Sequence, residues 1–294
     1  MSELMVSDQG PIVQSALLRT ELVRLRKEKK LTQEQVARQL EWSPSKLIRV
    51  EGGKNAITRT DLQALLTVYD VTSEGRQERL QALARGAREP AWWNAYRGDL
   101  DPNFLAYVGY SAGAAYIRQF HGTVVPGLIQ TPEYAEVLST GKVSEQARVL
   151  AAKLRIQRQQ EFAKRQNPPR QHYIIDEAVI RRHVGIGTDP AIMPAQLNHI
   201  ADVCERDDLV TVRVIPFSTG AHLGLEGPFS LLEFDGDLDD VLYLEGRSGA
   251  SVMILGEDDR VAEYRETFEL LLDQALPADE SVAMMRQAAE TLMN

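Results

Sequence analysis

The 294-residue sequence predicts a protein that is mainly α with an α+β second domain. The first part is expected to form a five-helix bundle, because apolar residues recur there at helical spacing between clear helix-start signals. Further along the chain, helical segments alternate with short runs rich in Val, Ile and Phe, which favour strands of a small sheet. The length also suggests roughly two domains, at about 150 residues each.

The change in pattern sets the expected domain boundaries. We expect an N-terminal tail at residues 1–14, the helical bundle at 15–88, a linker at 89–102 and the α+β domain at 103–294. The linker contains EPAWWNAY (89–96), which breaks the helical pattern and holds two of the three tryptophans. We interpret the adjacent aromatic residues as a packed interface between the domains, with a ligand-stacking platform as the alternative.

The net charge of -9 hides a local excess of positive charge. Residues 15–60 hold 11 Lys and Arg against 5 Asp and Glu, which gives +6, whereas residues 91–294 hold 18 against 30, which gives -12. A basic module in an acidic chain is typical of a protein in which one part faces a polyanion. A solvated helix face is the alternative that charge alone leaves open.

Strong signals mark the helices of the bundle. A first helix carries Leu18, Leu22 and Leu25 on one face. A second should begin at Thr32, whose hydroxyl can cap the helix while Gln35 bonds back to the cap. The third helix should begin at Ser43 as N-cap, with Pro44 at the first helical position, and end at Gly52-Gly53. A fourth helix is expected from Thr58, with Leu62, Leu65, Leu66 and Tyr69 facing inward, and a fifth over 77–85.

The second domain mixes helices and strands. Residues 116–125 are predicted to be extended, and 126–134 (PGLIQTPEY) to form a turn that leads into a helix. A long helix with six basic residues is expected over 145–165, in a structural or partner-facing role. Four short strands are expected at 172–176, 210–216, 229–234 and 241–245, with a hairpin turn at Asp235-Gly236, and two final helices near 257–275 and 279–293. The segment 217–227 (FSTGAHLGLEG) is either a plain connection or the lid of a small-molecule pocket.

No residue pattern indicates an enzyme, a metal site or a cofactor. The single cysteine, Cys204, is interpreted as a structural thiol, and the histidines lack the spacing of a helical metal pair. The acidic run from Asp235 to Asp240 lacks the glycine and glutamate positions of a calcium loop. The N-terminus does not resemble a signal peptide and no apolar segment is long enough to span a membrane, so we expect a cytoplasmic protein that is associated with the nucleoid and makes no membrane contact.

The run TQEQVARQLEWSPSKLIRVEGGK (32–54) resembles the helix-turn-helix of Xre-type transcription regulators, in which the third helix enters the major groove of DNA. The resemblance implies that Gln33 grips a backbone phosphate and that Lys46 and Lys54 contact phosphates. Pro44 departs from the hydrogen-bonding residue common in such regulators and can offer only apolar contact, so base reading should rest on Ser45 and Arg49. The expected DNA-binding residues are therefore Thr32, Gln33, Ser43, Pro44, Ser45, Lys46, Arg49 and Lys54.

The second domain also carries a resemblance. The segments IRQFHGTVVPGLIQTPEYAEVL, DEAVIRRHVG, QLNHI, VRVIPFSTGAH, FSLLEF and VLYLEG occur in this order. Together with the helix-turn-helix, they are similar to the WhiJ-like, antitoxin-like regulators of actinobacteria. That resemblance implies a small partner protein encoded nearby, and a small-molecule effector for the second domain.

Two functions follow from the sequence, and a third, a ligand-modifying enzyme with a DNA-binding appendage, is disfavoured because no constellation of residues supports it. The first is a sequence-specific DNA-binding transcription regulator that acts on double-stranded operator DNA, as a homodimer, and whose second domain dimerises and receives a partner or effector. The alternative is an antitoxin-like module that sequesters a small partner protein and binds DNA for autoregulation. Neither requires an enzymatic activity.

Overall fold

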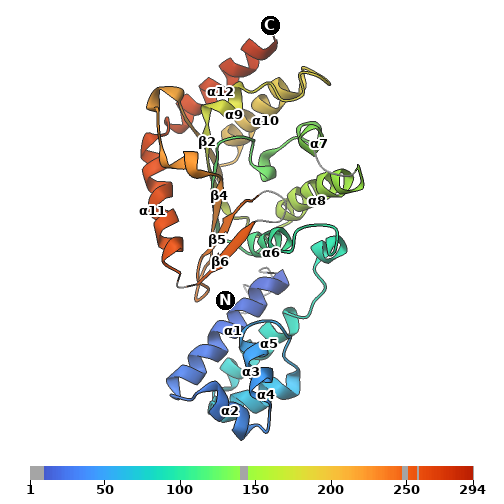
Figure 1. The fold of residues 1–294 in the computed structure, drawn as a ribbon, viewed down its shortest axis with the longest axis vertical. Coiled ribbons are helices and arrows are strands. Elements are labelled where there is room, and N and C mark those ends of the chain that lie inside the picture. The colour runs from blue at the N-terminus through green and yellow to red at the C-terminus, as the bar shows by residue number, and fades with distance from the viewer. Residues whose placement is uncertain (1–9, 140–144, 247–250, 257, 294) are drawn as a thin grey trace. The chain divides into compact units, whose positions relative to one another are not determined.

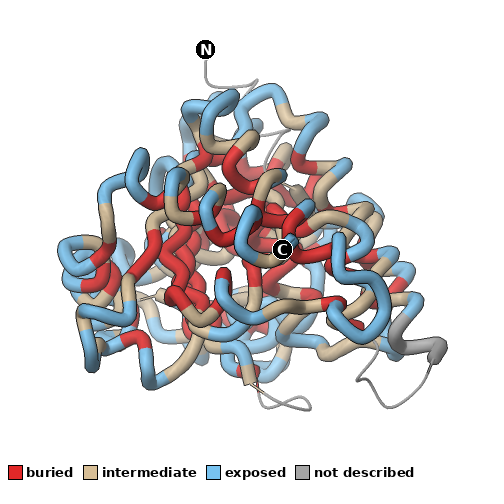
Figure 2. The backbone as a smooth tube through the Cα atoms, turned by 90° about the horizontal axis from the view of Figure 1, so that it is seen from above, coloured by how far each residue is buried: buried red, intermediate tan, exposed pale blue. Residues whose placement is uncertain are grey.

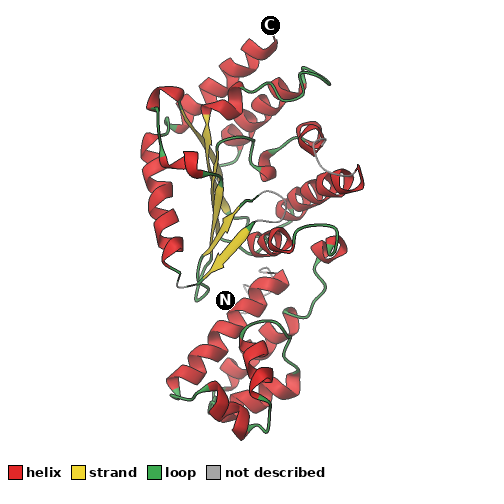
Figure 3. Ribbon diagram, viewed as in Figure 1, coloured by secondary structure: helices red, strands yellow, loops and turns green. Residues whose placement is uncertain are grey.

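The computed structural model describes residues 10–139, 145–246, 251–256 and 258–293. The chain divides into two compact units, Met1–Asn94 with Asp235–Leu238, and Ala95–Phe234 with Asp239–Asn294. The division after Asn94 falls inside the predicted linker of 89–102. Figure 3 shows helices in both units and strands in the second alone. Within the described residues, none of the helices is long and apolar enough to cross a membrane.

The first unit is the predicted five-helix bundle (Figure 1). Its helices are α1 (Gly10–Glu28), α2 (Gln33–Gln39), α3 (Pro44–Glu51), α4 (Arg59–Val68) and α5 (Glu74–Gly86). The core is built from leucines at the predicted positions, including Leu22, Leu47, Leu62, Leu65 and Leu66, each at most 1% exposed. Burying such a side chain contributes about 1.5 to 3 kcal/mol, so this apolar stripe holds the five helices together.

The N-terminal boundary differs from the prediction, and the predicted linker contains a short helical turn. Helix α1 begins at Gly10, so the tail expected at 1–14 is too long, and Val13 within it is fully buried. The helix-start signals that mark the other helices are absent here, so the start at Gly10 could not be predicted from local residues. Trp92–Tyr96 form a short 3-10 helix in which Trp93 is buried and packs edge-on against Trp92 at 5.5 Å between ring centroids.

The second unit is built on one mixed sheet with the strand order β3-β2-β1-β4-β5-β6. Strands β1 (Tyr116–His121), β2 (Arg170–Asp176) and β3 (Val210–Ile215) are parallel. Strands β4 (Phe229–Glu233), β5 (Val241–Leu244) and β6 (Val252–Leu255) are antiparallel, and β4 pairs with β1. Five of the six strands match the predicted segments. The first is shorter than the expected 116–125, and β6 was not predicted because four residues carry too little alternation to be recognised.

Helices cover both faces of this sheet (Figure 1). Helix α11 (Asp259–Gln274) lies on one face, where Phe268 and Leu271 pack on Phe120, Phe229 and neighbouring strand residues. The opposite face is covered by α6 (Pro102–Ser111), α7 (Pro132–Ser139), α8 (Glu145–Ala163), α9 (Glu177–Arg181), α10 (Ile192–Arg206) and α12 (Ala278–Met293). The sheet is therefore the middle layer of an α+β domain, as predicted from the segment pattern.

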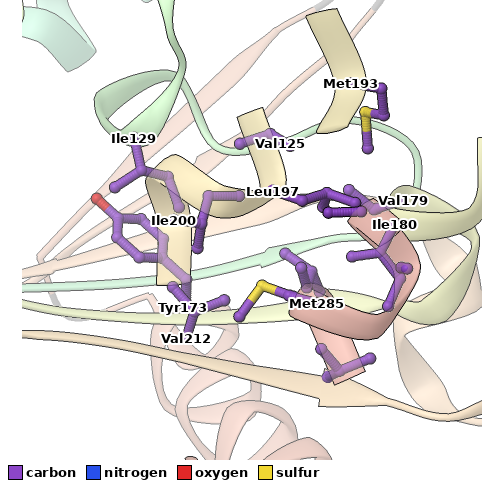
Figure 4. Packing of buried hydrophobic residues seen from close by; sticks show 14 of the residues in the cluster. Val125, Ile129, Tyr173, Val179, Ile180, Met193, Leu197, Ile200, Val212 and Met285 are labelled. Atoms are coloured by element: carbon purple, nitrogen blue, oxygen red, sulfur yellow. The ribbon is translucent and has the colours of Figure 1, made fainter. Parts of the chain in front are cut away.

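A large apolar cluster joins part of this second layer to the sheet (Figure 4). Tyr173 and Val212 of the parallel strands meet Leu197, Ile200 and Met285 from the helices, each at most 1% exposed. In Figure 2, the buried residues lie on the sides of the helices and strands that face the interior, and the exposed residues lie on their outer sides. Cys204 packs against the cluster, and burial raises the pKa of its thiol to about 11, as expected for a structural cysteine.

The segment 217–227 contacts the sheet and includes two 3-10 turns, Phe217–Thr219 and Leu223–Glu226. The Nε2 atom of His222, whose side chain is 2% exposed, lies 3.0 Å from Oδ2 of Asp176 at the end of β2. A Cβ at Gly224 would lie 2.3 Å from the Phe120 ring, so only glycine fits here without a shift. These contacts support the interpretation of this segment as an ordered connection.

Candidate nucleic-acid interface

The second helix begins as predicted, at a complete capping box. The backbone N–H of Gln35 donates to Oγ1 of Thr32 at 3.1 Å, and the backbone N–H of Thr32 donates to Oε1 of Gln35 at 2.8 Å. After α2 the chain turns through Glu41, which has a positive φ of 55°, and the Trp42 amide donates to the Ala37 carbonyl at 2.8 Å. This turn delivers the chain directly to the start of α3.

The start of α3 is confirmed in position, but not in the predicted cap bond. Ser43 has extended backbone angles and Pro44 occupies the first helical turn, where its missing N–H costs nothing. The Ser43 hydroxyl makes no bond to a helix amide and instead lies 3.2 Å from the hydroxyl of Ser45. The side chain of Ser43 is therefore exposed beside Ser45 and available to a molecule outside the bundle.

Helix α3 has one buried and one exposed face. Leu47 and Val50 are buried, whereas Ser45 and Arg49, one turn apart, are exposed. Arg49 pairs with none of the acidic side chains that the structure describes, and its Nε lies 3.3 Å from the side-chain amide group of Asn55. Ile48 is 51% exposed on the same helix, an apolar residue that the sequence reasoning did not assign to the site.

Lys46 is less free than predicted. Its Nζ lies 2.8 Å from Oδ1 of Asp61 on α4 and 3.9 Å from the ring centroid of Trp42. Because a carboxylate and an aromatic face already receive its charge, a phosphate would have to compete with both. Lys54, in the turn after α3, is exposed and forms no ion pair with a described residue, so it matches the predicted phosphate contact better.

Gln33 belongs to a polar network that links three helices. Its Nε2 donates to Oε2 of Glu51 at 2.7 Å, and Arg26 donates to both carboxylate oxygens of Glu51 at 2.8 and 2.9 Å. Arg26 also donates to the Leu31 carbonyl at 3.0 Å, and the bond to Glu51 raises the pKa of Arg26. The network, which we call the Arg26–Glu51 clamp, holds α1, the start of α2 and the end of α3 in one arrangement.

Two further basic residues are exposed around these helices and were not predicted as site residues. Arg38 lies near the end of α2, and Arg59 begins α4, a few residues after Lys54. Neither forms an ion pair with a described acidic residue, unlike Lys29, which pairs with Asp70 at 3.1 Å. The sequence shows that Arg38 and Arg59 are basic and lie near helix ends. It could not show that they form no ion pair with a described acidic residue, whereas Lys29 and Lys46 do.

Removal of the Thr32 hydroxyl should weaken the bundle without changing its surface charge. Thr32→Ala loses the side-chain half of the capping box, so the free energy of unfolding of the first unit should fall by about 1 kcal/mol. Chemical denaturation of the full chain measures this change. Thr60→Ala, at an exposed position inside α4, is the matched control and should change the free energy of unfolding by less than about 0.5 kcal/mol. Equal effects of both substitutions would contradict the cap.

The described part of the second unit offers no arrangement typical of a metal site. Among the described residues, no group of three or more His, Cys, Asp and Glu side chains could hold a metal ion. The buried and half-buried histidines are spread over separate elements: His121 ends β1, His172 lies on β2 and His222 bonds to Asp176. Burial lowers the pKa of His121 and of His172, which favours their neutral form.

The capped α2, the tight turn and the exposed face of α3 define a helix-turn-helix domain, the class that contains many DNA-binding regulators. Residues 17–80 match the family model described as a helix-turn-helix domain. Residues 104–287, more than half of the chain, match the model described as a domain of unknown function (DUF5753), and the chain belongs to this family. Comparison with curated proteins and with solved structures gave no match. The likeness to WhiJ-like regulators of actinobacteria stays a prediction.

Proposed function

We propose that the protein is a sequence-specific transcription regulator that reads operator DNA with α3 and acts by binding rather than by catalysis. The observation that carries the proposal is the exposed face of α3. Ser45 and Arg49 stand one turn apart on a helix that the Arg26–Glu51 clamp fixes to its neighbours. A fixed helix with hydrogen-bonding side chains on its free face suits recognition of base edges in the major groove.

The charges around α3 support a division between reading and positioning. Lys54 and Arg59, exposed after the end of α3, suit contact with backbone phosphates, whereas the side chain of Gln33 already donates to Glu51. Glu51, at the end of α3, is neutralised by Arg26. Phosphate contacts of this kind fix orientation on the duplex and make affinity depend on salt.

We further propose that the protein binds as a homodimer on a partly palindromic operator. One helix-turn-helix module contacts only a few base pairs, which gives too little discrimination against a genome of competing sites. Two modules related by a two-fold axis would read half-sites one helical turn apart. The small partner protein expected from the family resemblance, and the antitoxin-like role, have no structural observation in their favour.

The experiment that tests this function is selection of bound duplexes from a random DNA library by the full-length protein, followed by sedimentation of the complex. We expect an enriched motif with two-fold symmetry and two chains on each selected duplex. Enrichment of no motif would contradict sequence-specific binding. A motif without symmetry, bound by a single chain, would contradict the homodimer but not the proposal that α3 reads the DNA.

A further inference from the structure

A row of buried polar side chains crosses the sheet of the second unit on the face that α6 and α8 cover. Four residues occupy neighbouring positions on four adjacent strands: Tyr173 on β2, Gln119 on β1, Ser230 on β4 and Tyr243 on β5. Each is at most 4% exposed. Elsewhere this face of the sheet carries mostly Val, Ile and Leu. Buried polar groups need hydrogen-bond partners, so this row marks a place where polar groups meet inside the domain.

Helix α6 adds a tyrosine above this row. The ring of Tyr107 stacks on that of Tyr243 at 4.4 Å between centroids. Its hydroxyl oxygen accepts hydrogen bonds from Gln119 and from Nη2 of Arg158 on α8, the latter at 3.0 Å. Figure 1 shows α6 and α8 on the same side of the sheet, so both helices deliver side chains to one buried polar centre.

Arg158 is the charged member of this centre. The residue is 6% exposed, and Nη2 also donates to the hydroxyl of Ser111 at 3.1 Å. Its Nε is buried and has no hydrogen-bond partner, and none of the described carboxylates pairs with the guanidinium. All the partners that the structure gives it are neutral: two hydroxyl groups and the rings of Tyr107 and Phe162. Among the described residues, the guanidinium therefore has no buried counterion.

A second guanidinium lies nearby. Arg155, just under one turn earlier on α8, donates to the hydroxyl of Ser139 at 3.1 Å and pairs with no described carboxylate. Burial lowers the pKa of Arg155, the charge of Glu245 opposes that shift, and the charge of Arg158 adds to it. Glu245 is exposed and makes no described hydrogen bond to either arginine. The helix predicted to have a structural or partner-facing role thus turns two of its six basic residues toward neutral partners within the domain.

We propose that Arg155 and Arg158 bind an oxyanion, the carboxylate or phosphate group of a small molecule, inside the second unit. An oxyanion supplies what this centre lacks, which is negative charge and acceptors for guanidinium N–H groups such as the unpartnered Nε of Arg158. The aromatic rings of Tyr107, Tyr243 and Phe162 border the same centre and suit the organic part of such a ligand. This inference goes beyond the proposed function and does not depend on DNA binding.

The experiment is thermal unfolding of the full-length protein without DNA. Sodium phosphate and sodium acetate are compared with sodium chloride at constant ionic strength and pH. We expect phosphate or acetate to raise the unfolding midpoint of the second unit, by about 3 °C at ten times the dissociation constant, while chloride does not. A response to phosphate alone identifies a phosphate ligand, and a response to acetate identifies a carboxylate. No response to either oxyanion at tens of millimolar would overturn the proposal.

Variants locate the effect. Arg158→Met should remove the shift caused by the oxyanion, whereas Lys153→Gln, at an exposed position on the same helix, should retain it. If Arg158→Met does not fold, Arg155→Met provides the test by calorimetry, and its affinity for the responding oxyanion should fall at least tenfold. Wild-type affinity in Arg155→Met, or a full shift in a folded Arg158→Met, would overturn the proposal.

Discussion

Glu51→Ala is expected to unfold the first unit while the second unit stays folded. The carboxylate of Glu51, 4% exposed in its side chain, receives three hydrogen bonds from Arg26 and Gln33. Its removal leaves the guanidinium of Arg26, 14% exposed, without its acid partner. Breaking a buried pair in this way costs about 3 to 5 kcal/mol, which approaches the whole stability of a small domain.

Chemical denaturation followed by circular dichroism measures this effect, because loss of the five helices of the first unit lowers the helical signal before the main transition. Glu28→Ala is the matched control, since Glu28 pairs with Arg24 on the same helix but is 49% exposed in its side chain. That substitution should cost less than about 1 kcal/mol. Similar losses from Glu51→Ala and Glu28→Ala would show that the clamp does not hold the helices together.

Arg49→Ala is expected to erase much of the preference for the operator over random DNA. The side chain of Arg49 projects from the same exposed face as Ser45 and can reach O6 and N7 of a guanine with both arms of its guanidinium. Such a contact contributes about 1 to 3 kcal/mol of discrimination, so affinity for the operator should fall by roughly 5-fold to more than 100-fold. Affinity for random duplex should fall much less.

Lys54→Ala is the matched control for this prediction. A lysine that meets phosphate as a point charge contributes to every sequence alike, so both duplexes should be bound more weakly. The slope of log affinity against log salt should become shallower by about 0.9. Titrations of both variants on both duplexes across a salt series separate the two roles. Equal weakening of operator and random duplex by Arg49→Ala would contradict base reading by this residue.

The sequence predicted the first unit well because its signals are local. The Thr32 capping box and Pro44 at the start of α3 depend on residues within one helical turn, and both lie where predicted. The same local reasoning could not show which side chains have a partner far along the chain. Lys46 was assigned to phosphate from its place on α3, but Asp61, fifteen residues later, takes its charge. The Arg26–Glu51 clamp joins residues 25 positions apart, and no local pattern marks it.

In the second unit, too, local patterns predicted the strands but not the contacts between distant segments. Strand residues such as Val210, Val212 and Val214 alternate clearly, and β3 appears at the predicted place. The buried centre was missed because it takes Gln119 and Ser230 from different strands and Arg158 from a helix predicted only to be structural or partner-facing, with no sign of which of its six basic residues would be buried. Charged residues are exposed in most proteins, so the sequence favours an exposed Arg158. In the structure, Arg158 is buried against Tyr107 and Ser111 of α6.

The measurement that tests the central claim most directly is methylation interference on the selected operator. Dimethyl sulfate modifies N7 of guanine, which faces the major groove, and N3 of adenine, which faces the minor groove. If α3 reads the major groove from two chains, methylation of guanines in the two half-sites, one helical turn apart, should block binding, and Arg49→Ala should lose this sensitivity at the guanine that it contacts. Interference confined to adenines, or an identical pattern for Arg49→Ala, would contradict the account.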